Sequence, residues 1–161
     1  MPSKTSAGLL MFRKRAGILE VLLVHPGGPF WRNKDAGAWS IPKGEAAENE
    51  DFLSRAKTEF EEEVGIPAAG PFLELGQVKQ KGGKIVHAWA CEGELPDNFE
   101  HRSNTFEVEW PPRSGQREQF QEIDRVGFFS MNEASNKINA AQREFLNRLA
   151  GLIGERNERG L

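Results

Sequence analysis

The sequence predicts an α/β (α+β) protein in which helices cover both sides of a mixed β-sheet. Several short runs of branched apolar and aromatic residues are bounded by Gly and Pro, which is typical of strands. Two other segments carry apolar residues at helical spacing, one in the middle of the chain and one near the C-terminus. The length of 161 residues fits a single domain, so we expect residues 1–161 to form one.

The first half of the chain predicts two strands, a short third strand and one clear helix. Residues 6–13 and 18–24 are apolar runs separated by a polar, Gly-ended turn. The loop at 30–37 is followed by a short strand at 39–41, which Pro42 stops. An apolar stripe predicts a helix over 48–64, with Gly65 as its C-terminal cap. The stripe consists of Phe52, Ala56, Phe60 and Val64.

The second half predicts a hairpin, two further strands and two helices. Residues 72–80 and 84–92 flank a Gly-Gly pair, which indicates paired strands. Residues 104–110 alternate as a strand does, and residues 124–129 are expected to form the last strand. Helices are predicted at 131–137 and 139–153, where the apolar face consists of Ile138, Phe145, Leu149, Leu152 and Ile153.

Composition narrows the functional classes. The chain has 21 basic and 24 acidic residues, and a net charge of −3 argues against a nucleic-acid binder. The single cysteine, Cys91, excludes an internal disulfide and a multi-cysteine zinc site, and it fits the reducing cytoplasm. No apolar run reaches the length of a membrane span or of a signal-peptide core. A homodimer is compatible with the sequence, although no exposed apolar seam marks an interface.

Three acids on one side of the central helix predict a metal site. Glu59, Glu62 and Glu63 follow the helical spacing of three and four residues, so their like charges repel. A divalent cation removes that penalty. Mg²⁺ suits these oxygen ligands and shares its remaining positions with water and substrate phosphates, and Mn²⁺ is an alternative ion. A structural domain with a merely solvated acidic helix is the competing interpretation.

The spacing around these acids resembles the signature of Nudix hydrolases. That signature is Gly, five residues, Glu, seven residues, Arg-Glu-apolar, any residue, Glu-Glu, any residue, Gly-apolar. The chain matches eight of the nine specified positions: Gly44, Glu50, Glu59, Phe60, Glu62, Glu63, Gly65 and Ile66. The exception is Thr58, where the family usually has Arg.

The resemblance implies an α/β/α sandwich around a mixed sheet, with the signature at 44–66, and hydrolysis of nucleoside diphosphates linked to another moiety. It implies that Glu59, Glu62 and Glu63 are metal ligands and that the backbone oxygen of Gly44 reaches a metal. Glu50 matches a bracing residue. Because Thr58 cannot replace an arginine fork, we hypothesise that Arg55 takes over part of the bracing. The alternative is that Arg55 is simply solvated.

Substrate contacts lie outside this signature. The hairpin lysines Lys79, Lys81 and Lys84 can hold a polyphosphate by charge, with Lys84 the best match to dinucleoside polyphosphate hydrolases. An ordinary basic turn is the alternative for each lysine. Lys43 is a further candidate contact. Trp31 lies in a predicted loop and is the best candidate for stacking on a base.

A further acid before the last strand is the candidate proton acceptor. Glu122 matches the family best, and Glu118 is its rival. The expected substrates are dinucleoside polyphosphates, then nucleoside triphosphates, and then capped RNA ends. The alternative is a catalytically weak nucleotide-sensing module, which the substitution at Thr58 would favour.

Overall fold

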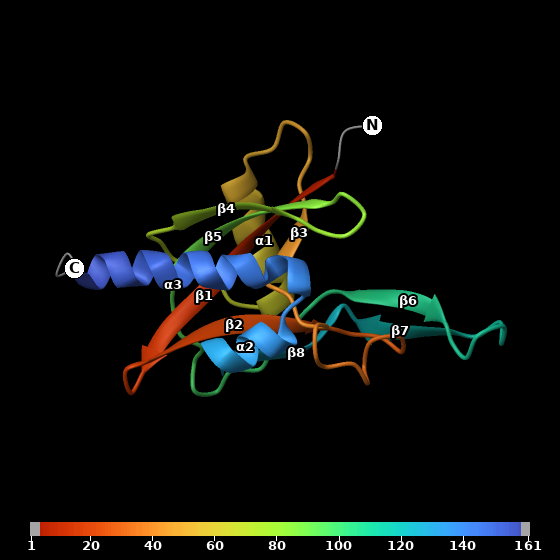
Figure 1. Cartoon of the computed structure of the whole chain (residues 1–161). Coiled ribbons are helices and arrows are strands. Elements are labelled where there is room, and N and C mark those ends of the chain that lie inside the picture. Colours follow the sequence, from red (N-terminus) through yellow and green to blue (C-terminus); the bar gives the residue numbers. More distant parts are fainter. Residues whose placement is uncertain (1–3, 159–161) are drawn as a thin grey trace.

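The computed structural model describes residues 4–158, which fold into a central sheet with helices on both faces (Figure 1). The strand order is β4-β5-β1-β2-β8, and β3 pairs with β1. The strands are β1 (Thr5–Arg15), β2 (Ile18–Pro26), β3 (Lys43–Glu45), β4 (Leu73–Lys79), β5 (Ile85–Glu92) and β8 (Ile123–Ser130). The sheet is mixed because β1 and β5 run parallel while the other pairs run antiparallel.

Two apolar layers make this fold a sandwich. The central strand β1 sends alternate side chains to opposite faces, as the pleat requires. Leu10 and Phe12 join one cluster under α2 (Met131–Lys137) and α3 (Arg143–Glu158). Leu9 and Met11 join another cluster under α1 (Phe52–Val64). The predicted α/β/α class is therefore confirmed, and the predicted C-terminal apolar face packs on the sheet.

A second, two-stranded sheet projects from the sandwich (Figure 1). It pairs β6 (Thr105–Glu109) with β7 (Arg117–Gln121) in an antiparallel hairpin. The sequence predicts the first of these strands but not its partner. Phe120 is the only apolar residue of β7, so alternation gives no signal there.

The segment 39–52 differs from the sequence predictions in three ways. The predicted strand at 39–41 forms only isolated bridges, from Ser40 to Val24 and from Trp39 to Ile138. The regular strand lies just after it, at β3, beyond Pro42, where the prediction ends the strand. The central helix begins at Phe52 rather than at residue 48, because Asp51 caps it by accepting a hydrogen bond from the Ser54 N–H.

The outer edge of β4 is covered by an arginine of α3. The Arg148 Nη1 donates to the carbonyl oxygens of Leu75 and Gln77, at 2.8 and 3.0 Å. The strand bulges between Glu74 and Gly76, and Gly76 has a φ of 81°. A side chain at Gly76 would crowd this guanidinium, so the bulge and the edge contact belong together.

No helix within residues 4–158 is long and apolar enough to cross a membrane.

Candidate active site

The helix α1 fixes the direction of the acidic side chains. Its buried stripe of Ala56, Phe60 and Val64 packs on the sheet, and Gly65 ends it in the left-handed conformation with a φ of 98°. Both the stripe and the cap agree with the sequence prediction. Because that stripe is held against the sheet, Glu59 and Glu63 lie beside β3.

Close backbone contacts place two carboxylates at β3. The Lys43 backbone N–H donates to Glu63 Oε2 at 3.0 Å. A methyl group at Gly44 would overlap the carboxylate of Glu59, so only glycine allows this approach. Gly44 therefore brings its backbone and the Glu59 carboxylate to the same point, while Glu62 is exposed beside them.

Burial and neighbouring carboxylates raise the pKa values of Glu59 and Glu63. Burial raises the pKa of Glu63 to about 8, and the charges of Glu59 and Glu122 push it in the same direction. Burial and the charge of Glu62 likewise raise the pKa of Glu59, against the opposing effect of Arg55. The acids therefore form one electrostatic unit, and a bound cation would relieve the repulsion among them.

Glu122 lines a small cavity together with Glu63 of this unit. The cavity of about 220 Å³ is lined by Lys43, Glu63 and Glu122, together with apolar residues of β2 and the segment 38–41. The turn at Glu122 is held by backbone bonds, because its carbonyl accepts from Gly27 N–H and its N–H donates to Asn104, each at 2.8 Å. The rival acid, Glu118, lies in β7 and does not line the cavity.

The residues of this face fit a hard divalent cation. Within residues 4–158, no three acidic, histidine or cysteine side chains are already gathered as a metal cluster. Arg55 forms an ion pair with Glu59, and the charge of Lys43 favours the ionised form of Glu63, so the described residues relieve only part of the repulsion among these acids. The donors that converge are carboxylate oxygens and the backbone at Gly44, which suit Mg²⁺ or Mn²⁺.

Arg55 contacts two acids of the signature, Glu50 just before α1 and Glu59 within it. Its guanidinium donates to Glu50 Oε2 at 2.7 and 2.9 Å and to Glu59 Oε1 at 3.2 Å. Hydrogen bonding to Arg55 lowers the pKa of Glu50. The arginine hypothesised from the sequence is therefore in bonding contact with the bracing acid and with a candidate ligand.

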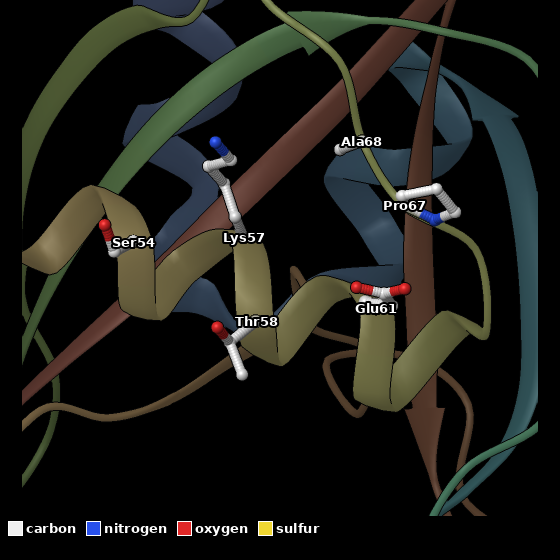
Figure 2. A pocket seen from close by; sticks show the side chains of 6 residues that line it. All are labelled: Ser54, Lys57, Thr58, Glu61, Pro67 and Ala68. Carbon is white, nitrogen blue, oxygen red and sulfur yellow. The ribbon is translucent and has the colours of Figure 1, made fainter.

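Thr58 lies on the outer side of α1, in a shallow groove (Figure 2). The groove is lined by Ser54, Lys57, Thr58, Glu61, Pro67 and Ala68. Both Thr58 and Glu61 are exposed there. Thr58 thus lines a surface different from the cavity that Glu63 and Glu122 share.

The lysines expected to bind phosphate are distributed over two segments. Lys79 ends β4, Lys81 lies in the following turn and Lys84 precedes β5. All three are exposed. Burial lowers the pKa of Lys43, Glu63 opposes this effect, and the positive charge of Lys84 adds to it. Lys84 and Lys43 are therefore electrostatic neighbours.

Trp31 is one of three large apolar side chains that the described residues expose. Its side chain is 43% exposed, and the Lys34 Nζ lies 4.9 Å from its ring centroid. Its neighbour Phe30 packs edge-on against Trp110 of the β6–β7 hairpin, with 5.7 Å between ring centroids. Phe30 therefore joins the projecting hairpin to this loop, a contact that the sequence does not predict.

Sequence reasoning also misses the role of His25. This fully buried imidazole contacts Asp124 Oδ1 through Nδ1 at 2.7 Å and the Lys34 carbonyl through Nε2 at 2.6 Å. It thereby joins the Trp31 loop to β8, two residues beyond Glu122. No spacing in the sequence signals this contact, because His25 and Asp124 are 99 residues apart.

Comparison with known proteins identifies the family. The family model of the NUDIX domain matches residues 2–149. A Caenorhabditis elegans Ap4A hydrolase in a binary complex has 21% identity and a TM-score of 0.65, covering 94% of this chain and 98% of its own. The ADP-ribose complex of the NUDIX domain of Shewanella oneidensis NrtR has 12% identity and a TM-score of 0.66, covering 95% and 90%.

A MutT protein from Methanosarcina mazei is similar in the same way, with 20% identity and a TM-score of 0.59 over 92% of this chain and 94% of its own. No curated protein sequence matches the chain. At these identities the solved structures establish the fold, and the family model covers nearly the whole sequence. The chain therefore belongs to the Nudix hydrolase family.

Proposed function

We propose that this protein is a Mg²⁺-dependent hydrolase of phosphoanhydride bonds in nucleotides, with dinucleoside polyphosphates as preferred substrates and nucleoside triphosphates next. The observation that carries the proposal is the meeting of Lys43, Glu63 and Glu122 at one cavity, beside Gly44 and Glu59. This arrangement supports the proposal, because the chemistry requires a cation for phosphate, acids for a metal and a separate acid for a proton near one point.

In this proposal, Glu59, Glu62 and Glu63 hold the metal together with the backbone oxygen of Gly44. Bound Mg²⁺ supplies charge neutralisation at the phosphates and a more acidic water. Lys43 and Lys84 bind phosphate oxygens. Glu122 accepts the proton of the attacking water, because it faces the cavity across from α1.

The remaining contacts position these groups. Arg55 and Glu50 hold Glu59 in place, and Lys79 and Lys81 extend the positive surface that binds the phosphate chain. Trp31 stacks on a nucleobase. The free, buried Cys91 fits a reducing compartment, so we place the activity in the cytoplasm.

Product analysis tests this function. The protein is incubated with Mg²⁺ and, separately, with diadenosine tetraphosphate, nucleoside triphosphates and nucleotide sugars, and the products are separated by ion exchange. We expect ATP and AMP from the first substrate, and we expect Glu62→Gln to abolish their formation. Release of pyrophosphate from triphosphates alone would instead indicate a pyrophosphohydrolase of the nucleotide pool.

A nucleotide-sensing module is the second candidate, because Thr58 replaces the usual arginine. Tight Mg²⁺-dependent binding of one nucleotide without turnover of any would favour this module over the hydrolase. Arg55 opposes the sensing alternative, since its guanidinium already contacts Glu59.

A further inference from the structure

Gln142 is a buried polar residue whose side chain joins two segments of the candidate active site. Only 1% of its surface is exposed. Its Oε1 accepts from the Ile41 N–H at 3.0 Å, and its Nε2 donates to Ser40 Oγ at 3.1 Å and to Gln80 Oε1 at 2.9 Å. Every polar atom of this amide therefore has a partner, which is what a buried amide requires.

The first segment that Gln142 holds leads directly into the phosphate and metal contacts. Ser40 and Ile41 line the same cavity as Lys43 and Glu63. Ser40 also exchanges two backbone hydrogen bonds with Val24 of β2, at 2.9 and 3.0 Å. Ile41 is thus held two residues before Lys43, where β3 begins.

The second segment is the turn between β4 and β5, residues 79–84, which we call the lysine turn. Gln80 organises it through its backbone, because its N–H donates to the Lys84 carbonyl at 2.7 Å and its carbonyl accepts from Gly83 N–H at 3.0 Å. The same residue offers its side chain to Gln142. Any shift of Gln80 therefore moves Lys84 and its neighbours.

Gln142 is itself held against the first segment. The Asn139 N–H donates to the Trp39 carbonyl at 2.7 Å, and the Gln142 N–H donates to the Asn139 carbonyl at 2.9 Å. The Asn139 side chain caps the short 3₁₀ helix Ala140–Gln142 by accepting from Ala141 N–H. The Gln142 amide thus extends from a fixed backbone toward the lysine turn.

We infer that Gln142 is a positioning residue that holds the lysine turn at a fixed separation from Lys43 and thereby determines which polyphosphate length the enzyme accepts. A linear polyphosphate that contacts both Lys43 and the lysine turn must span the distance between them. This inference rests on the proposed function, because it assigns Lys43 and the lysine turn to one phosphate chain.

Binding of inorganic polyphosphates tests the inference without turnover. The affinities of pyrophosphate and tripolyphosphate are measured by calorimetry for the wild type, Gln142→Leu, Gln80→Leu and the double variant. We expect the wild type to prefer tripolyphosphate, and each single variant to reduce that preference about tenfold. The double variant is expected to lose no more of the preference than the more affected single variant, because both substitutions remove the same hydrogen bond between Gln142 and Gln80.

Leu149→Ala is the matched control. Leu149 is a fully buried residue of α3 in the same apolar layer. Its truncation therefore destabilises the fold without removing the hydrogen bond between the Gln142 and Gln80 side chains. Its preference ratio should equal that of the wild type. Gln80 is only half-buried, so Gln80→Leu keeps the test available if Gln142→Leu does not fold.

Three results would overturn the inference. They are a wild type without preference, a preference that survives in Gln80→Leu, and a preference that Leu149→Ala also removes. Failure of the proposed function is recognised separately, because it would appear as absent hydrolysis of every nucleotide by the wild type. Absent hydrolysis together with a lost preference in both glutamine variants would retain Gln142 as the residue that positions the lysine turn.

Discussion

The Arg55 guanidinium donates two hydrogen bonds to the same oxygen of the Glu50 carboxylate, at 2.7 and 2.9 Å. The remaining nitrogen of the fork lies 3.2 Å from Glu59. One cation therefore joins the bracing acid of the loop to a candidate metal ligand of the helix. The usual arginine of the family would start three residues later, at Thr58.

This contact predicts the effect of removing Arg55. Arg55→Ala should lower Mn²⁺ affinity and kcat/KM by tenfold or more, on the order of the loss seen when residues behind a metal ligand are removed. Arg55→Lys should recover only part, because an ammonium cannot form the fork. Calorimetric Mn²⁺ titration gives a readout independent of turnover. Lys57→Ala, on the exposed outer face, is the control, and equal losses in both variants would refute the bracing role.

Restoring the family's arginine at position 58 should have little effect. Thr58 lines the outer groove with Ser54 and Glu61 (Figure 2). Arg55, by contrast, already occupies the contact with Glu59. We expect Thr58→Arg to leave kcat/KM within about twofold of the wild type. A large gain in turnover would show that Arg55 does not replace the missing residue.

The two candidate proton acceptors can be separated by substitution. Glu122→Gln should lower kcat by about 10²-fold or more with little change in KM, because Glu122 lines the cavity. Glu118→Gln should have almost no effect, since Glu118 lies in the projecting hairpin. Steady-state kinetics on diadenosine tetraphosphate measure both, and equal effects would contradict the assignment.

The stability of the acidic helix should depend on Phe60. This side chain is fully buried and packs with Leu9 and Leu22 beneath α1. Phe60→Ala should lower the free energy of unfolding by about 3–5 kcal/mol, as measured by urea denaturation. Glu61→Ala, one position along on the exposed side, should change it by less than about 0.5 kcal/mol.

Cys91 should resist alkylation in the folded protein. Burial raises the pKa of its thiol to about 12. In an unfolded chain the thiol has a pKa of about 8.5, as in model peptides. At about pH 9 the native thiol should react on the order of a hundredfold more slowly than in guanidinium chloride. This burial also contributes stability that is complete below the unfolded pKa and is lost as pH rises toward 12. Equal reaction rates in the two states would contradict the buried position.

The sequence predicts the acidic helix well because its determinants are local. The spacing of Ala56, Phe60 and Val64 and the cap at Gly65 lie within one segment, and the structure confirms them. Glu59 and Glu63 follow from the same spacing. Their approach to Gly44 and Lys43, by contrast, depends on how β3 pairs with β1.

Contacts between distant segments could not be predicted in this way. Gln80 and Gln142 are 62 residues apart, and nothing in either neighbourhood marks a polar core contact. The strand β7 is equally hidden, because its charged sequence lacks alternation and it forms only against β6. Tertiary pairing determined both features.

The guanidinium of Arg148 has a consequence for the behaviour of this protein in concentrated solution. A free strand edge is a template on which a second chain can add its own strand, and such growth leads to aggregation. Here the carbonyls of Leu75 and Gln77 are already occupied by Arg148, and the Gly76 bulge distorts the edge between them. A second chain could extend the sheet at β4 only by displacing a charged side chain, so this arrangement opposes edge-to-edge aggregation.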